Sequence, residues 1–487
     1  MSWLLGHAET SYTHHTSPIP LVTKSGTKTT LPELAQSSIP PCRLNPFLFN
    51  GHLQTMYTAV KDPGPPIYYK RHLYTSNHTV YPGTFAVDFV VSKEEGFEAA
   101  KDTELPERTA LYTSREWENL GSDDNKPMLI ALHGLTGGSH EVYLRETLAP
   151  LTASGWEACV VNGRGCALSK ITSPQLFNAR ATWDVRQAIQ ELHALFPNRP
   201  LYAVGYSLGA NILTNYCGEE GGKCVLKAAV ANSNPWNLEV CNVELNRTWL
   251  GVEVYSRTMG RNLMGLYERH KEQMVQDPGI KAEVIEKCKY LYEFDRHVQC
   301  PTWGYPTEGA YYRDAQSVDA LVAIRVPFLG INAEDDPVRL HLEFPLTERL
   351  EFSMTERLEF LIIERLEFLI IERLEFLIIE RLEFLIIERL SYDTLQISSK
   401  AAIPYEEFKQ NPYALLCTTN WGGHLGSFQL GGGRWFATAT ASFLSKVHET
   451  IDHGASKVSR GEDKVEAPNK AYPIFDPNNR RLILPEA

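Results

Sequence analysis

The chain has 487 residues, of which 43% are hydrophobic, and it carries a formal net charge of −12. A chain of this length and composition can bury a large apolar core, either in one large domain or in two ordinary ones. The acidic balance argues against nucleic acid, or a strongly anionic membrane surface, as the main partner.

Nine cysteines are scattered along the chain, with no C-x-x-C pair and no spacing typical of zinc ligands. We therefore expect no metal site, and the odd number predicts reduced thiols in an intracellular compartment. The start, MSWLLGHAETSYTHH, lacks the pattern of a secretory signal, and no long apolar run predicts a transmembrane segment. We expect a protein that is not secreted, either cytoplasmic or peripherally associated with lipid surfaces.

In chain order, residues 1–80 are rich in Pro, Thr and His, which predicts a mostly irregular N-terminal segment. Short apolar stretches then alternate with longer amphipathic ones. The apolar stretches predict strands at residues 84–91, 128–132, 158–161, 201–206 and 227–231. The amphipathic stretches predict helices at residues 140–151, 181–195 and 208–217. This alternation predicts a mostly parallel sheet with helices on both faces, in a domain over residues 81–451.

Residues 236–325 interrupt the alternation with helical and aromatic sequence, which predicts a helical cap inserted into the sheet domain. The alternation resumes with predicted strands at residues 327–331 and 413–418 and a helix at residues 435–447. Residues 452–487 are polar and are expected to form a loosely ordered tail.

The strongest motif is Gly205-Tyr206-Ser207-Leu208-Gly209, between an apolar strand and a helix-like run. A strand–turn–helix with G-x-S-x-G is the sequence context of a nucleophile elbow. The turn strains the serine backbone, and its glycines make room for the neighbouring strand and helix. We therefore predict Ser207 as a catalytic nucleophile at the start of a helix, where developing negative charge is favoured.

The glycine-rich sequence HGLTGG follows the predicted strand at residues 128–132. Such a turn directs backbone N–H groups at a substrate carbonyl, so the N–H groups of Leu135 and Leu208 are the predicted oxyanion hole. His133 is predicted to support this turn, because the general base of this kind of fold follows the serine.

The acid and the base are expected after the serine, in the order Ser, Asp, His. Asp336 follows a predicted strand and directly precedes Pro337, so it is the favoured acid, with Asp335 as the alternative. A helix-capping pair of aspartates would give the same pattern. His424 lies in the glycine turn WGGHLG after the last predicted strand, and it is the predicted base.

Several stretches together resemble the α/β-hydrolase subgroup that contains fungal medium-chain fatty-acid ethyl ester synthase/esterases, the AB hydrolase 4 type family. They extend from about residue 46 to residue 443 and include PFLFNGHLQTMY, LHGLTGGSHEVYLR, VVNGRGCALS, YAVGYSLGANIL, INAEDDPV and TTNWGGHLG. The resemblance implies the α/β-hydrolase fold, with a mostly parallel eight-stranded sheet and an inserted helical cap. It also implies Ser207, Asp336 and His424 as the catalytic triad.

The activity that this resemblance implies is acyl-ester hydrolysis and, in the fungal branch, acyl transfer from a coenzyme A thioester to an alcohol. We expect a serine esterase or alcohol acyltransferase that acts on medium-chain acyl esters or acyl-CoA through an acyl-serine, without a cofactor. Aromatic residues of the predicted cap are expected to line its acyl pocket: Trp249, Tyr255, Tyr267 and Trp303. A lipase or phospholipase-type hydrolase is the alternative.

Residues 342–389 depart from the family pattern, because they form six tandem octapeptides, four of them identical copies of LEFLIIER. Each octad holds two Glu and one Arg, so together they contribute −6 of the net charge. Leu, Glu and Arg favour a helix, but a period of eight drifts by about 80° per repeat around one. Because the insertion separates Asp336 from His424 in the sequence, a weakened pseudoenzyme or interaction protein is a further alternative.

Overall fold

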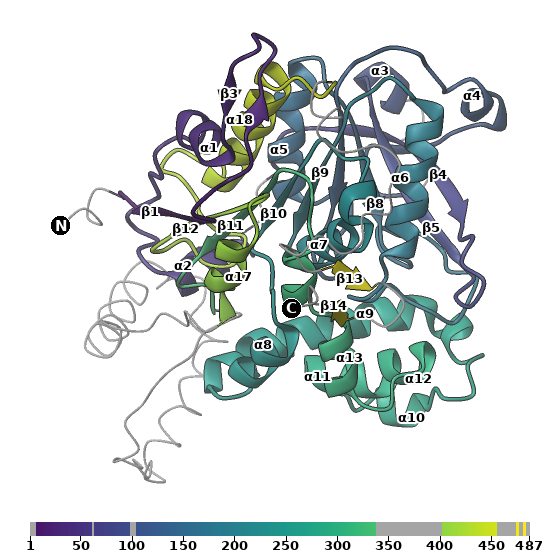
Figure 1. The fold of residues 1–487 in the computed structure, drawn as a ribbon. Helices are drawn as coiled ribbons and strands as arrows, with labels where there is room; N and C mark the ends of the chain where they lie inside the picture. Colours follow the sequence, from purple (N-terminus) through teal and green to yellow (C-terminus); the bar gives the residue numbers. More distant parts are fainter. Residues whose placement is uncertain are drawn as a thin grey trace, which may run out of the picture. The chain divides into compact units, whose positions relative to one another are not determined.

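The structure is a computed structural model, and Figure 1 shows its fold. It describes residues 6–60, 63–97, 104–337, 402–454, 474–476 and 481–483. By its internal contacts the chain divides into residues 340–399 and the remainder. The octapeptide repeat at residues 342–389 lies outside the described residues, as does most of the predicted tail.

One large sheet forms the centre of the described part of the chain (Figure 1). Its strands are β1 (Thr10–His14), β4 (Tyr68–Thr75), β5 (Thr84–Val91), β6 (Thr109–Leu111), β7 (Met128–Leu132), β8 (Glu157–Asn162), β9 (Leu201–Tyr206), β10 (Ala228–Asn232), β11 (Phe328–Ala333) and β12 (Ala414–Thr419). Two small strand pairs lie outside it, β2 (Leu21–Val22) with β3 (Lys28–Thr29) and β13 (Ile474–Asp476) with β14 (Arg481–Ile483).

The strand order is β1-β12-β11-β10-β9-β7-β8-β5-β4-β6, and the neighbours from β12 to β8 are parallel. Strands β1, β5 and β4 run antiparallel to a neighbour near the two edges. The predicted parallel sheet is therefore confirmed, although the described residues form ten strands in it instead of the expected eight.

The central strands are buried along their whole length, as sequences such as MLIAL in β7 and LYAVGY in β9 require. Strands covered on both faces carry continuous apolar runs instead of an alternating pattern. Strands β5, β7 and β9 have the predicted bounds, and the other predicted strands are displaced at their ends by one or two residues.

Helices cover both faces of the sheet (Figure 1). One face packs against α1 (Leu31–Ser38), α5 (Val142–Ala153) and α18 (Trp435–Thr450). The other packs against α6 (Trp183–Leu195), α7 (Leu208–Glu220), α14 (Val318–Leu321) and α17 (Tyr405–Gln410). Shorter helical segments lie in connections, namely α2 (Gly51–Tyr57), α3 (Lys93–Phe97), α4 (Ser114–Glu118) and η2 (Gly221–Lys223).

The N-terminal 80 residues differ from the irregular segment expected from composition. They supply β1 and β4 to the main sheet and also form α1 and α2. The local signals are present in the sequence: Thr30 and Glu33 form a capping box at α1, and Asn50 caps α2. Composition did not predict β1 and α1, because β1 pairs with β12 and α1 packs against α18, both far along the chain.

Between β10 and β11 the chain forms the helical cap predicted at residues 236–325, at the lower end of Figure 1. Its elements are α8 (Leu238–Leu245), the π-helix η3 (Leu250–Ser256), α9 (Arg257–Met274), α10 (Ala282–Ile285), α11 (Leu291–Phe294), the π-helix η4 (Asp295–Gln299), α12 (Cys300–Trp303) and α13 (Glu308–Ala315). Among the described helices, none combines the length and apolarity that crossing a bilayer requires.

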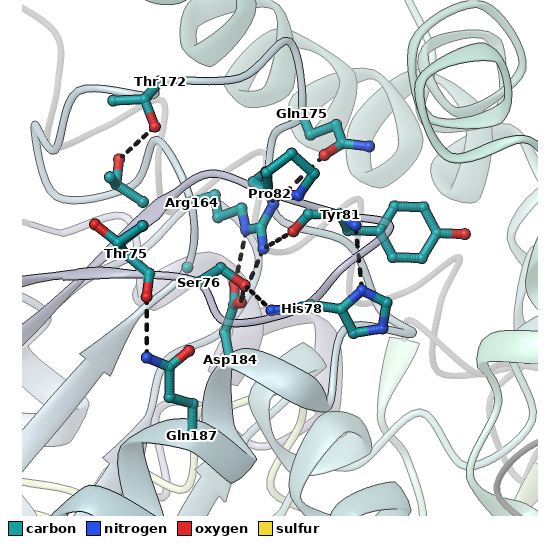
Figure 2. A network of polar contacts seen from close by, with 12 residues as sticks. Thr75, Ser76, His78, Tyr81, Pro82, Arg164, Thr172, Gln175, Asp184 and Gln187 are labelled. Carbon is teal, nitrogen blue, oxygen red and sulfur yellow. Dashed lines mark hydrogen bonds and ion pairs between the residues drawn. The ribbon is translucent and has the colours of Figure 1, made fainter.

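A buried arginine, Arg164, lies at the centre of a network of polar contacts (Figure 2). Arg164 Nε and one of its terminal nitrogens donate to the two carboxylate oxygens of Asp184, at 2.8 and 2.9 Å. Its terminal nitrogens also donate to the carbonyl oxygens of Tyr81 and Pro82. The guanidinium lies 5.6 Å from the ring of the cap residue Trp303. The pair is structural, because its donors are directed at the carboxylate and at backbone carbonyls.

Candidate active site

Ser207 occupies a strained turn between β9 and α7. Its backbone has φ 51° and ψ −117°, a conformation that a residue with a side chain rarely adopts. The glycines on either side make this approach of strand and helix feasible. A Cβ on Gly205 would lie 2.5 Å from the carbonyl oxygen of Gly209, and one on Gly209 would lie 2.4 Å from that of Leu132. The G-x-S-x-G motif therefore has the steric reason that was predicted for it.

The structure brings the three predicted triad residues into contact. Ser207 Oγ lies 2.8 Å from His424 Nε2, and His424 Nδ1 lies 2.7 Å from Asp336 Oδ2. With the proton on Nδ1 donated to Asp336, Nε2 is free to accept the hydroxyl proton of Ser207. Asp336 is 1% exposed, so this carboxylate is held away from water.

The neighbouring Asp335 has different partners. Its Oδ1 accepts the backbone N–H groups of Gly422 and Gly423, at 2.9 and 3.0 Å, in the turn that carries His424. Burial raises the pKa of Asp335 to about 7, although the amide donors act in the opposite direction. The two aspartates thus divide the work: Asp336 contacts the imidazole, and Asp335 holds the backbone of its turn.

The N-terminal helix α2 supports the histidine turn from the other side. Thr55 Oγ1 accepts the backbone N–H of His424 at 2.8 Å, and Gln54 Oε1 accepts that of Phe428 at 2.8 Å. Sequence reasoning did not identify these residues. The stretch PFLFNGHLQTMY, which contributed to the family resemblance, contains both and was the available signal.

The predicted oxyanion turn lies beside Ser207. Leu135 and Leu208 line the same cavity as Ser207, and Leu208 is the first residue of α7. His133 supports this turn as expected, because its Nδ1 contacts the Gly134 carbonyl oxygen at 2.7 Å and its Nε2 accepts the Gly163 N–H at 2.9 Å. Burial lowers the pKa of His133 to about 4, so the ring stays neutral.

A cavity of about 100 Å³ opens beside Ser207 under the cap. Its lining is mostly apolar: Leu135, Phe177, Ala179, Leu208, Pro235, Leu238, Cys241, Leu245, Met259, Leu263, Leu291, Tyr311 and Tyr312, with Ser207, Asn242, Asp295 and Gln299. A second cavity of about 440 Å³ lies beside His424, and its lining includes Tyr57, Tyr143, Phe428 and Arg434. Each cavity borders one reacting group, Ser207 in the first case and His424 in the second.

The prediction that four aromatic residues of the cap line the acyl pocket is wrong. Trp249 is 65% exposed, and the Tyr255 hydroxyl contacts His52 Nδ1 at 2.7 Å. Tyr267 belongs to the hydrophobic core of the cap, and Trp303 packs on Arg164. None of the four lines the cavity beside Ser207, because composition alone cannot tell which face of a cap helix points inward.

Within the described ranges, no cluster of three or more His, Cys, Asp or Glu side chains has a metal-binding arrangement. All nine cysteines lie in the described part of the chain, and each is a free thiol. Neither observation adds a residue to the site around Ser207.

A strained serine after a strand, linked through a histidine to a carboxylate, is the arrangement that defines the α/β-hydrolase class. Comparison with known proteins agrees, because the profile described as "alpha/beta hydrolase fold" matches residues 127–249. The chain is 32% identical to the monoacylglycerol lipase of Saccharomyces cerevisiae over 446 residues, which covers 87% of this chain and 85% of that relative.

Two further relatives are more distant. The medium-chain fatty acid ethyl ester synthase/esterase 2 of Saccharomyces cerevisiae is 29% identical, over 84% of this chain and 86% of the relative. Phospholipase ABHD3 of Mus musculus is 27% identical, over 68% of this chain and 65% of the relative. The chain belongs to the α/β-hydrolase family, in the subgroup of esterase- and lipase-type hydrolases that contains these yeast proteins.

Proposed function

We propose that the protein is a serine-dependent carboxylic ester hydrolase that acts on lipid acyl esters through an acyl-serine intermediate. The observation that carries this proposal is the pair of short contacts from Ser207 to His424 and from His424 to Asp336. The roles follow the geometry: Ser207 is the nucleophile, His424 the general base and Asp336 the group that orients the imidazole.

In the first half of the reaction, Ser207 Oγ attacks the ester carbonyl while His424 Nε2 takes the hydroxyl proton. The N–H groups of Leu135 and Leu208 stabilise the oxyanion that forms on the former carbonyl oxygen. When this intermediate collapses, the C–O bond to the alcohol breaks and His424 returns the proton to the leaving oxygen. The acyl group is then bound to Ser207 as an ester.

In the second half, a water molecule attacks the acyl-serine while His424 acts again as base, and the fatty acid is released. An alcohol that replaces this water forms a new ester instead, with the same proton transfers. The name of the second yeast relative supports this transfer as a finer activity of the same site. An acyl-CoA would then serve as the acyl donor, as a cosubstrate and not as a bound cofactor.

Lipid esters are the substrate class that the relatives favour, since their names include a monoacylglycerol lipase and a phospholipase. The cavity beside Ser207 supports this choice, because an acyl chain needs an apolar wall. Peripheral association with a lipid surface, which such substrates would require, stays a prediction.

The alternative of a weakened pseudoenzyme rests on the insertion between Asp336 and His424. The 2.7 Å contact between these two side chains argues against it, because the insertion has not separated them in space.

The test combines an active-site probe with product analysis. A fluorophosphonate should label the full-length protein rapidly at Ser207, since only an activated serine reacts quickly. Products from medium-chain ethyl ester, monoacylglycerol, phospholipid and acyl-CoA, each with and without added ethanol, should then rank hydrolysis against transfer. A protein that neither labels nor converts any of these substrates would contradict the proposal.

A further inference from the structure

The short helix α2 lies between the cap and the turn that carries the catalytic histidine. Its Thr55 Oγ1 accepts the backbone N–H of His424 at 2.8 Å. Near the start of the same helix, His52 Nδ1 contacts the hydroxyl of Tyr255 at 2.7 Å. Tyr255 belongs to the π-helix η3 of the cap, and the two rings are stacked with their centroids 5.8 Å apart. Helix α2 therefore has one partner in the cap and another at the reacting groups.

The contact between His52 and Tyr255 is largely shielded from water. Tyr255 is 9% exposed, and burial lowers the pKa of His52, so the imidazole is neutral at neutral pH. Burial also raises the pKa of Tyr255, and the carboxylates of Asp336 and Asp335 act in the same direction, which indicates that the phenol lies near the acid side of the triad. In a place with little water, a lost hydrogen bond is not fully replaced by a bond to solvent.

Helix α2 packs closely enough to carry a displacement from one partner to the other. A Cβ on Gly51 would overlap the carbonyl oxygen of Asp335, so the first residue of the helix lies directly against the acid turn. Thr55 donates its hydroxyl to the Gly51 carbonyl oxygen at 2.7 Å while it accepts the His424 N–H. His52 and Thr55 are three residues apart, so they are neighbours on the surface of one helix turn. A shift at His52 therefore reaches the histidine turn.

The cap is also attached on the side of the catalytic serine. Tyr311 Oη accepts the backbone N–H of Ala179 at 2.8 Å, and both residues line the cavity beside Ser207. The bond from Tyr255 to His52 supplies an attachment on the side of the histidine turn. The cap thus contacts both walls of the active site.

We propose that His52 and Tyr255 are positioning residues, which hold the base His424 in its reactive geometry through α2 and Thr55. This rests on the proposed ester hydrolase function. Neither His52 nor Tyr255 lines the cavity beside Ser207 or the one beside His424, so they act through the helix. The reaction rate thereby depends on the attachment of the cap as well as on the triad.

The first experiment removes one hydroxyl from the cap. In Tyr255→Phe, kcat of the full-length protein for p-nitrophenyl acetate should fall by about fivefold, the effect of one buried hydrogen bond, with KM little changed. Tyr290→Phe is the matched control, because the Tyr290 hydroxyl donates to Glu253 of the same π-helix at 2.7 Å. The control should keep kcat within about twofold. Circular dichroism checks that both variants fold.

A double-mutant cycle tests the route through α2. In a Thr55→Val background the acceptor for the His424 N–H is absent, so adding Tyr255→Phe should lower kcat by less than about twofold. Independent effects would multiply, and a further fall of about fivefold would overturn the proposed route. His52→Phe should match Tyr255→Phe, and the variant with both changes should be no slower than either alone. Either single variant serves for the test if the other does not fold.

An unchanged kcat in a folded Tyr255→Phe protein, or a rise in KM alone, would overturn the inference while the ester hydrolase function stands. Hydrolysis by the wild type, with rapid fluorophosphonate labelling of Ser207, identifies that case. If the wild type hydrolyses no ester and Ser207 does not label, the proposed function fails, and the inference fails with it.

Discussion

The sheet side of the active site is held by backbone geometry, whereas the cap side is held by side-chain packing. On the sheet side, Ser207 has a strained backbone, and backbone amides of the histidine turn are bound by Asp335 and Thr55. On the cap side, helices pack through buried apolar residues such as Leu263 and Phe294, and side chains of the cap, Leu263 among them, line the cavity. Reaction geometry thus depends on positions where few substitutions fit, while substrate preference depends on side chains that can change.

The largest expected effect breaks the sheet side at its centre. Ser207→Ala removes the nucleophile without leaving a large cavity, so the fold should persist. Ester hydrolysis should fall by at least about 10⁴-fold, and fluorophosphonate labelling should disappear. The loss of hydrolysis is measured with p-nitrophenyl esters, and the loss of labelling is measured on the intact protein. Ser37→Ala, on the exposed side of α1, is the control. Retained hydrolysis in the Ser207→Ala protein would contradict the nucleophile assignment.

The next effect separates the two aspartates. Asp336→Asn should lower kcat by about 10³–10⁴-fold, because the imidazole loses the carboxylate that fixes its tautomer. Asp335→Asn keeps an oxygen that can accept from Gly422 and Gly423, so it should cost far less, about tenfold or below. Steady-state kinetics on both variants checks the pair, and the reverse order of effects would assign the acid to Asp335.

A smaller effect tests the support from α2. Thr55→Val removes the acceptor for the His424 N–H while keeping the shape of the side chain. We expect kcat to fall by about tenfold with KM little changed, because the Thr55 hydroxyl bonds to the His424 N–H and to the Gly51 carbonyl oxygen. Thr438→Val, an exposed substitution on α18, is the matched control. A change in KM with unchanged kcat would mean that α2 acts on substrate binding and not on the histidine turn.

The smallest effect concerns the stability of the cap side. Burial raises the pKa of Asp295 to about 7, above its value of about 3.9 in an unfolded chain. Between these pH values the folded protein holds a proton that the unfolded chain has released, so the free energy of unfolding falls as pH rises. Asp295→Asn keeps an acceptor for Tyr312 and removes this titration.

The Asp295→Asn variant should therefore be more stable than the wild type at pH 8, by on the order of 1 kcal/mol, and about equal at pH 4. Urea unfolding at the two pH values measures the difference. Glu283→Gln, an exposed substitution on α10, should show no such pH-dependent gain. A gain of the same size at pH 4 and pH 8 would show that titration of Asp295 does not cause it.

The fold and the reacting groups could be predicted largely from local sequence. Continuous apolar runs at residues 128–132 and 201–206 predict buried parallel strands, because burial on both faces leaves no alternating pattern. The G-x-S-x-G turn predicts Ser207 for an equally local reason, since its steric requirement lies within five residues. The positions of Asp336 and His424 follow from chain order after strand ends.

Only the tertiary structure decided which groups surround these residues. Thr55 contacts His424 across 369 positions of the chain, and Gln299 faces a cavity that Trp249 and Tyr267 do not reach. The tertiary structure also gave Asp335 and Asp336 different partners, although the two residues are adjacent in sequence. A pattern in sequence reports the backbone conformation that a segment favours, whereas the face that a side chain presents depends on distant segments packing against it.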